Sequence, residues 1–243
     1  MSLIGVIASA ARRRGGFVPT DVAGCAVWLD FADSSTLFDA TTGGSTPAAD
    51  GNIRRIEDKS GNSKHFTEHT SVLAPVRKLA QINGLDVGYF TSDYMTRAES
   101  LATSGGGALF MVVQRTADAG GGTHGIRGNS NGNGHPISGT YYESFGVTAR
   151  QTWSQAYRTD VHLYSVIWSG AGTWLARING ATVKTSTGLS GANTQNPIVI
   201  GANKISGANP GNGYYGELAV YTSAVSTGDR DELEAALMAK WGI

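Results

Sequence analysis

The sequence predicts an all-β fold, a sandwich of antiparallel strands closed by one short C-terminal helix. Three observations lead to this prediction. Charged residues make up only 16% of the 243 residues, whereas 34 residues are glycine, a composition typical of many short strands joined by turns. Short apolar segments recur at the spacings of a sandwich. Helical periodicity is convincing only near the C-terminus.

Two segments are expected in the middle of the sandwich. In residues 25–31 both alternating sets of side chains are largely apolar, and residues 108–114 are apolar almost throughout. A strand that is apolar on both faces is buried on both faces. Asn179-Gly180 predicts a two-residue hairpin turn. Further strands are expected at residues 53–56, 87–91, 141–147, 162–168, 174–178 and 198–201.

The spacing of apolar residues changes near the C-terminus, from the period of a strand to that of a helix. Residues 213–221 alternate as a strand, and Ser226 followed three residues later by Asp229 indicates the start of a helix. A helix this short is marginal alone in water, so we expect its apolar stripe to pack against the strands. The stripe consists of Leu233, Leu237 and Trp241.

Charge and cysteine content exclude several classes of protein. The 19 basic and 19 acidic residues balance, and we expect no nucleic-acid partner because neutralising phosphates requires a basic excess. Cys25 is the single cysteine, which excludes an internal disulfide framework. No stretch approaches the roughly 20 apolar residues that a membrane span requires.

An N-terminal segment, residues 1–20, precedes one expected domain, residues 21–243, because composition does not shift after residue 20. The apolar part of the segment comes before its arginines, which reverses the order of a secretory signal. The segment is either a poorly ordered tail or a peptide that orders on a partner protein, with membrane association as a third alternative. The docking hypothesis rests on Leu3, Ile4, Ile7, Arg12, Arg13 and Arg14.

Several segments occur in an order and spacing that are typical of one family. They include Val27-Trp28-Leu29-Asp30, Asp58-Lys59-Ser60-Gly61-Asn62, Ile178-Asn179-Gly180, Tyr215-Gly216-Glu217-Leu218-Ala219-Val220-Tyr221 and Ala239-Lys240-Trp241-Gly242. With them the chain resembles the concanavalin A-like lectin/glucanase superfamily, specifically the laminin-G-like jelly-roll modules of phage and bacterial surface proteins. The resemblance implies a jelly roll of two antiparallel sheets packed face to face, one of them concave. It also implies a sugar site on the concave face or at the loop rim.

Catalytic relatives carry acids at alternate positions of one strand, and retaining hydrolysis uses two carboxylates about 5 Å apart. No strand here has the Glu-x-Asp-x-x-Glu pattern, and Glu143 and Asp160 stand alone. We therefore expect no enzymatic activity.

An aromatic and polar cluster is the candidate carbohydrate-binding site. A sugar requires aromatic surface for its apolar face and planar polar side chains for its hydroxyls, although aromatic residues of a sandwich also form its core. The cluster comprises Tyr141, Tyr142, Trp153, Gln155, Tyr157 and Arg158, with Arg150 nearby.

Calcium is the one cofactor that the resemblance suggests. Some relatives bind it through loop oxygens, as a hard cation requires. The alternative is that Asp30 and Asp58 cap turns by bonding backbone amides. The candidate ligands are Asp30, Asp58, Asn62 and Asp93.

These observations predict a non-enzymatic adhesion or structural protein of a phage or phage-like particle, as a fibre, spike or decoration component. It is expected on the virion surface, made in the bacterial cytoplasm without a signal peptide, as a homo-oligomer or in many copies. Its expected partners are other virion proteins and a host surface glycan. The alternatives are a polysaccharide-degrading glycoside hydrolase and a structural module that makes protein contacts only.

Overall fold

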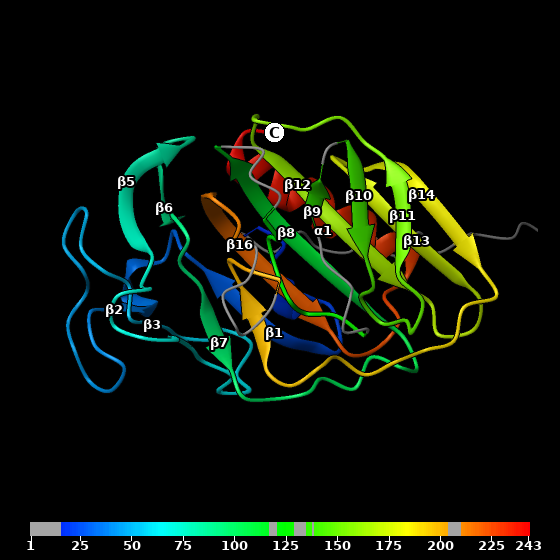
Figure 1. Ribbon diagram of the computed structural model, residues 1–243, viewed down its shortest axis with the longest axis horizontal. Coiled ribbons are helices and arrows are strands. Elements are labelled where there is room, and N and C mark those ends of the chain that lie inside the picture. The colour runs from blue at the N-terminus through cyan, green and yellow to red at the C-terminus, as the bar shows by residue number, and fades with distance from the viewer. Residues whose placement is uncertain (1–15, 117–120, 129–134, 138, 204–209) are drawn as a thin grey trace, which may run out of the picture.

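The computed structural model describes residues 16–116, 121–128, 135–137, 139–203 and 210–243, and it confirms an antiparallel β-sandwich with one C-terminal helix (Figure 1). The main sheet has eight strands in the order β14-β13-β12-β8-β16-β6-β5, with β1 paired to β16. These strands are β1 (Cys25–Asp30), β5 (Val76–Ile82), β6 (Leu85–Phe90), β8 (Gly107–Arg115), β12 (His162–Trp168), β13 (Thr173–Ile178), β14 (Ala181–Thr187) and β16 (Gly213–Tyr221).

Two smaller sheets form the second layer. A five-stranded sheet has the order β15-β7-β4-β3-β2, and a three-stranded sheet has the order β11-β10-β9. Side chains of both sheets join the main sheet in one apolar cluster, the inner core. The strands are β2 (Leu37–Phe38), β3 (Arg55–Ile56), β4 (Phe66–Glu68), β7 (Met95–Arg97), β9 (His135–Ile137), β10 (Thr140–Glu143), β11 (Gln151–Ser154) and β15 (Ile198–Ile200).

Strand β8 shows how alternation builds both faces of the main sheet. It pairs with β12 on one side and β16 on the other, which confirms its predicted central place. Met111 and Val113 point into the inner core. Phe110 and Val112 point the other way, into a second apolar cluster that we call the outer core. Side chains of the two faces therefore come from alternate positions of one strand.

Helix α1 (Thr227–Trp241) covers the outer core. The backbone N–H of Asp229 donates to Ser226 Oγ at 3.1 Å, and Gly242 ends the helix with a φ of +71°. The start signal was predicted from the sequence. The predicted apolar stripe is also confirmed, because Leu233, Leu237 and Trp241 are buried in the outer core.

A buried carboxylate fastens the middle of α1 to the sheet. Glu234 accepts a hydrogen bond from Ser165 Oγ of β12 at 2.5 Å. The same carboxylate accepts from Nε and Nη2 of Arg177 on β13, each at 3.0 Å to its nearer oxygen. This paired geometry is the strong form of an arginine–carboxylate interaction.

The strand predicted at residues 141–147 ends early, at Glu143. The Glu143 carboxylate accepts hydrogen bonds from the backbone N–H groups of Ser144 and Phe145, both at 2.8 Å, and Gly146 has a φ of +71°. These interactions turn the chain where apolar alternation alone predicted a longer strand. Among the other differences, the strand predicted at 53–56 is confined to β3. The seven-residue strand β5 and two single-turn helices, η1 (Pro19–Asp21) and η2 (Ser34–Thr36), were not predicted.

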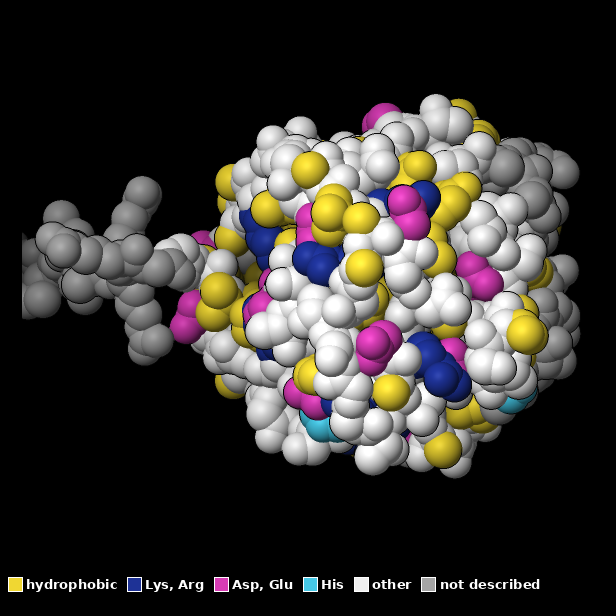
Figure 2. Space-filling view, turned by 90° about the vertical axis from the view of Figure 1, so that its left-hand side faces the viewer, with side chains coloured by type: hydrophobic (Ala, Val, Ile, Leu, Met, Phe, Trp, Pro, Cys, Tyr) yellow, Lys and Arg dark blue, Asp and Glu magenta, His cyan; other side chains and the backbone are white. Residues whose placement is uncertain are grey.

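The surface carries charges of both signs. Figure 2 shows a face on which basic and acidic side chains are interspersed, with no continuous area of one sign. In the part of the chain that the structure describes, no helix is long and apolar enough to span a membrane. The predicted docking residues, from Leu3 to Arg14, lie outside the described residues.

Candidate functional site

The β10–β11 hairpin brings the predicted aromatic residues together. Tyr141 lies opposite Trp153, and the two rings stack with centroids 4.9 Å apart. Tyr141 is only 4% exposed and belongs to the inner core. Trp153 is half-buried and meets Trp174 edge-on, with centroids 6.2 Å apart. The Tyr141 ring is therefore part of the core, and the partly exposed Trp153 ring packs over it.

The other predicted residues lie at the surface of the same hairpin. Tyr142 projects from the opposite face of β10, and the Arg150 guanidinium lies 4.5 Å from its ring centroid. Gln155, Tyr157 and Arg158 follow β11 and are half-buried. These partly exposed aromatic and planar polar side chains thus come from both faces of the hairpin and from the segment that follows it. We call this set, Tyr142, Trp153, Gln155, Tyr157 and Arg158, the hairpin rim.

A buried ionised carboxylate lies beneath the hairpin. Besides its two backbone donors, Glu143 accepts a hydrogen bond from Tyr164 OH at 2.9 Å, and His124 Nε2 lies 3.1 Å away. Burial alone raises the pKa of Glu143, but His124 and these hydrogen bonds outweigh it and hold the pKa below its usual value. Each oxygen of the Glu143 carboxylate therefore already has two polar partners within hydrogen-bond distance.

Polar side chains continue from Glu143 across one end of the inner face. Arg115, Tyr164 and Tyr215 come from three strands of the main sheet and are buried. Tyr141 faces them from β10, with its ring centroid 5.2 Å from that of Tyr164. Burial raises the pKa of Tyr141, and Arg115 offsets part of that effect. We call Arg115, Tyr141, Glu143, Tyr164 and Tyr215 the inner polar site.

Buried polar atoms that lack a hydrogen-bond partner gather around this site. Among the described residues they include Trp153 Nε1 and Arg158 Nε on the hairpin side. On the other side they include Tyr215 OH and both side-chain amide atoms of Asn203. Most buried polar groups of folded proteins are paired, so a local concentration of unpaired ones requires an explanation.

Sequence reasoning missed most of the inner polar site. Arg115, Tyr164 and Tyr215 are far apart along the chain and meet only through the strand order. One signal was present, because Tyr164 alternates with Val166 and Trp168 on the inward face of β12.

The predicted calcium ligands are engaged inside the protein. The Asp58 carboxylate accepts four hydrogen bonds, from the backbone N–H groups of Trp28, Ser60 and Lys64 and from Ser60 Oγ. Asn62 Nδ2 donates to the Cys25 carbonyl at 2.9 Å.

Asp93 lies in a separate turn and accepts from the Thr91 backbone N–H at 2.8 Å. Within the described ranges no group of three or more His, Cys, Asp or Glu side chains is placed to hold a metal ion. The turn-capping alternative accounts for Asp58, and Asp93 caps its own turn in the same way, whereas Asn62 donates to strand carbonyls.

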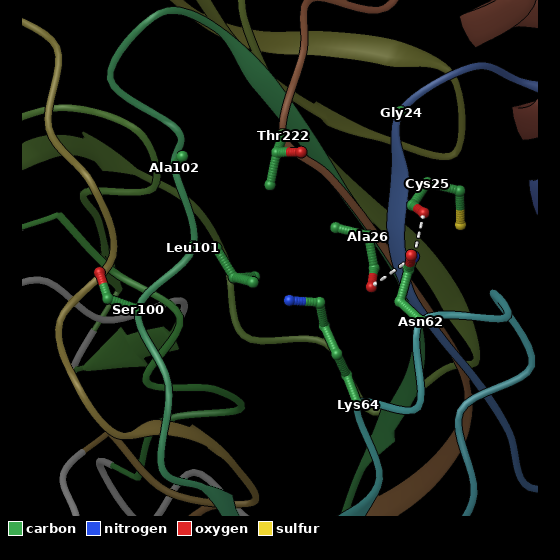
Figure 3. Close-up of a pocket in the computed structure, with 9 residues that line it drawn as sticks. All are labelled: Gly24, Cys25, Ala26, Asn62, Lys64, Ser100, Leu101, Ala102 and Thr222. Atoms are coloured by element: carbon green, nitrogen blue, oxygen red, sulfur yellow. Dashed lines mark hydrogen bonds between the residues drawn. The ribbon is translucent and has the colours of Figure 1, made fainter.

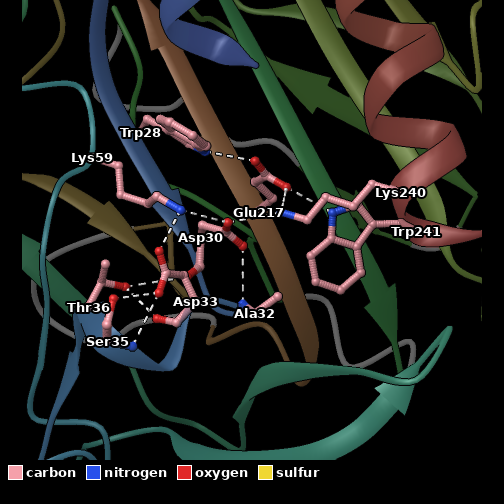
Figure 4. Close-up of polar contacts among 10 residues, drawn as sticks. All are labelled: Trp28, Asp30, Ala32, Asp33, Ser35, Thr36, Lys59, Glu217, Lys240 and Trp241. Carbon is pink, nitrogen blue, oxygen red and sulfur yellow. Dashed lines mark hydrogen bonds and ion pairs between the residues drawn. The ribbon is translucent and has the colours of Figure 1, made fainter. Parts of the chain in front are cut away.

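Asp30, the fourth predicted ligand, belongs to a charged network beneath α1 (Figure 4). It lies opposite Glu217 across the β1–β16 pair, and Lys240 Nζ bridges the two carboxylates at 2.9 and 2.6 Å. The indole N–H groups of Trp28 and Trp241 both donate to Glu217, at 2.7 and 2.9 Å. Burial and the neighbouring Asp30 raise the pKa of Glu217, while Lys240 lowers it.

A cavity of about 460 Å³ adjoins this network. Its walls are the Gly16–Pro19 segment, one side of α1, and the Trp28, Asp30, Lys59 and Glu217 side chains. Lys59 Nζ lies 4.5 Å from the Trp28 ring centroid and also bonds Asp30 and Asp33. Each carboxylate of the network thus has an internal cation as its partner.

A second cavity, of about 410 Å³, lies at the loop rim between the start of β1 and residues 100–102 (Figure 3). Lys64 points into it, and Asn62 bonds the backbone carbonyls of Cys25 and Ala26 at its wall. Burial raises the pKa of the Cys25 thiol to about 12. Cys25 is therefore a protonated, unreactive thiol at neutral pH.

Comparisons with known proteins identify a fold for this chain but no family. No family model and no curated protein matches the chain. Several solved structures match it. One is a GH54 α-L-arabinofuranosidase soaked with a cyclic sulfate inhibitor, with a TM-score of 0.64 and 15% identity over 93% of this chain and 66% of that one.

Two further structures contain saccharides. Domain 4 of AbnA, a GH43 extracellular arabinanase from Geobacillus stearothermophilus, in complex with arabinotriose, has a TM-score of 0.56 and 12% identity over 88% of this chain and 99% of that one. The ligand-binding domain of botulinum neurotoxin serotype D, in complex with N-acetylneuraminic acid, has a TM-score of 0.61 and 11% identity over 92% of this chain and 55% of that one.

The chain thus spans about two thirds of the arabinofuranosidase structure and about half of the toxin structure. At these identities the likeness concerns the fold. The chain has the β-sandwich fold of these glycoside hydrolase and ligand-binding domains, as the jelly-roll resemblance predicted.

Proposed function

We propose that this domain binds carbohydrate through the hairpin rim and the inner polar site, and does not cleave it. One observation carries the proposal. Partly exposed aromatic and planar polar side chains gather on one hairpin, where Trp153 stacks on Tyr141, which belongs to a buried set of Tyr, Arg and Glu side chains. A saccharide offers an apolar ring face to the aromatics and hydroxyls that both donate and accept hydrogen bonds. Structures of similar fold contain arabinotriose or N-acetylneuraminic acid, which supports this ligand class.

Two observations favour binding over hydrolysis. Glu143 is fully buried and already accepts three hydrogen bonds beside His124, so it has no free lone pair directed at a substrate. Asp30 and Glu217 are close enough for an acid pair, but the same ammonium group, Lys240 Nζ, lies between them. A general acid and a nucleophile must both reach the scissile bond, which this arrangement prevents.

A glycan array tests the proposal. We expect the purified chain to bind a subset of saccharides, and Tyr142→Ala and Arg158→Ala to weaken that binding at least tenfold without changing the thermal midpoint, because both side chains are half-exposed. Val72→Ala, at an 83% exposed position, is the matched control and should bind as the parent does. An array without a single bound saccharide contradicts carbohydrate binding and favours a module that makes protein contacts only.

Incubation with the bound polysaccharide tests the absence of catalysis. We expect the chain-length distribution of the polysaccharide to stay unchanged. Shortened chains would establish the hydrolase alternative, and their loss in Asp30→Asn or Glu217→Gln would locate its acids.

The finer part of the proposal concerns display. We propose that residues 1–20 attach the domain to a phage or phage-like particle in several copies, so that it contacts a host surface glycan. The jelly-roll resemblance and the apolar-then-basic N-terminal sequence support this role. Deleting residues 2–16 should leave a folded domain that no longer joins the particle, whereas retained incorporation contradicts docking by this segment.

A further inference from the structure

The cavity beside α1 has the size and the walls of a small-molecule site. Its volume of about 460 Å³ lies within the range of roughly 300–1,000 Å³ that is typical of such sites. Apolar surface comes from the Gly16–Pro19 segment, from Ala236, Leu237 and Ala239 of α1, and from Trp28. Ligand sites usually combine such apolar walls with a few polar groups that fix the orientation of the ligand.

Two lysines supply hydrogen-bond donors at this cavity. Lys59 Nζ and Lys240 Nζ lie 3.1 and 2.9 Å from the same oxygen, Asp30 Oδ2, so the two ammonium groups are neighbours (Figure 4). Each has one further carboxylate partner, Asp33 for Lys59 and Glu217 for Lys240. An ammonium group has three N–H donors, so each lysine has one more than these carboxylates use. The lysine side chains are 22% and 33% exposed, and a ligand can therefore reach them.

The carboxylates at the cavity supply acceptors. Among the described residues, Asp30 Oδ1 accepts one hydrogen bond, from the Ala32 backbone N–H at 3.1 Å. Glu217 Oε1 likewise accepts one, from Trp28 Nε1 at 2.7 Å. A carboxylate oxygen can accept two hydrogen bonds. The cavity thus offers donors and acceptors side by side, next to apolar walls.

This combination selects the class of ligand. A hydroxyl group both donates and accepts, so it can bond an ammonium group and a carboxylate together. An anion such as phosphate only accepts and would be repelled by Asp30 and Glu217, and an organic cation would be repelled by the two lysines. A sugar ring carries several hydroxyls and an apolar face, which matches both kinds of wall.

We propose that the cavity beside α1 binds one uncharged sugar residue, with Lys59 and Lys240 donating to its hydroxyls and Asp30 and Glu217 accepting from them. The cavity lies on the outer side of the main sheet, whereas the hairpin rim belongs to the layer on the other side. It is a second site, and it does not rest on the binding proposed for the hairpin rim.

The indole N–H resonances of the full ¹⁵N-labelled chain report on this site. Trp28 and Trp241 both donate to Glu217, whereas Trp168 and Trp174 lie in the inner core and serve as internal controls. We expect methyl glycosides of glucose, galactose, mannose and arabinose to include at least one that shifts the first pair saturably and leaves the second pair in place. Inorganic phosphate and butylammonium, the anionic and cationic probes, should cause no saturable shift. The proposal is overturned if no glycoside shifts the Trp28 resonance, or if only an ion does.

Two neighbouring positions of α1 provide a matched pair of variants. Ala236 lines the cavity, whereas Ala235 is exposed and is not part of its walls. Ala236→Phe should fill the cavity and abolish the glycoside-induced shifts, and Ala235→Phe should retain them. Lys59→Met keeps the apolar stem without the donors and should weaken binding about tenfold, the loss of one hydrogen bond to the ligand. Equal binding by the two phenylalanine variants contradicts a site in this cavity.

Tyr142→Ala separates this inference from the proposed function. The change removes a side chain of the hairpin rim, so we expect it to leave the glycoside-induced shift of the Trp28 resonance intact. Loss of that shift in Tyr142→Ala together with its retention in Ala236→Phe would refute the cavity site and leave binding at the hairpin rim standing. A shift of the Trp28 resonance that Ala236→Phe abolishes supports the cavity site even if the glycan array shows no bound saccharide.

Discussion

At the scale of single residues, buried charge is the main feature of this domain. Glu143 is ionised inside the sandwich, and its pKa lies below its usual value. His162 is buried and its pKa is lowered, chiefly by burial, so it is neutral in the fold. Both groups take up protons more readily when the chain is unfolded, so both contribute stability that is lost on acidification.

This linkage predicts the pH dependence of stability. The His162 contribution should decline as pH falls below 6.5, the usual histidine value, and the Glu143 contribution as pH falls below 4.5, the usual glutamate value. Denaturant titrations between pH 8 and pH 3 should therefore give a free energy of unfolding that falls in two stages. Glu143→Gln should reduce the lower stage, to which Asp33 and Asp160 also contribute because their pKa values are lowered too. It should cost about 3–5 kcal/mol at neutral pH, because it breaks a buried charged network. A flat profile in the parent chain would contradict this account.

Calcium gives a second prediction at this scale. Because internal donors occupy both oxygens of Asp58 and one oxygen of Asp93, we expect excess chelator to leave the thermal midpoint unchanged. Differential scanning fluorimetry with EDTA and with added Ca²⁺ measures this. A midpoint that rises with Ca²⁺ and falls in Asp58→Asn would instead establish the predicted metal site.

The residue scale is also where sequence prediction was weakest. Tyr141 and Trp153 could be grouped because a short hairpin brings them together. Arg115, Tyr164 and Tyr215 could not, since they meet only through the strand order. Likewise, whether Asp58 binds a metal or caps a turn depends on which backbone amides face it, which alternation patterns do not reveal.

At the scale of elements, α1 holds the outer side of the main sheet. Its apolar stripe packs on the outer core, Glu234 bonds β12 and β13, and Trp241 donates to Glu217 on β16. A helix of this length gains its stability from such packing. The sequence predicted this element well because caps and periodicity are local signals.

The helix gives a mutational prediction. Trp241→Ala should destabilise the domain by about 3–5 kcal/mol, since it removes a fully buried indole and its hydrogen bond to Glu217. Glu232→Ala, at an exposed position of the same helix, is the control and should change stability by less than about 0.5 kcal/mol. Urea denaturation measures both. Equal losses in the two variants would mean that α1 is not held through Trp241.

Gly216 of β16 packs closely against the same helix. A Cβ at this position would lie 2.8–2.9 Å from three carbons of the Trp241 ring. Gly216→Ala should therefore displace the indole and lower the thermal midpoint, which circular dichroism follows. The effect should largely disappear in the Trp241→Ala background, because the ring that clashes is then absent.

At the scale of the whole molecule, composition and alternation were enough for the sandwich. Strands such as β8 and β12 are long and apolar, so their period identifies them. The short strands β4, β7 and β11 have three or four residues each, too few for a period to be read. Their places are set by pairing with distant neighbours, and those strands build the layer that contains the hairpin rim.

The position of the Gly16–Pro19 segment has a consequence for presentation. It lines the cavity beside α1, on the outer side of the main sheet, whereas the β10–β11 hairpin belongs to the layer on the other side. A fusion partner or support joined ahead of Gly16 is therefore anchored at the back of the domain. Immobilised in that orientation, the hairpin faces the solution, and a polymer too large to enter a cleft can still reach it.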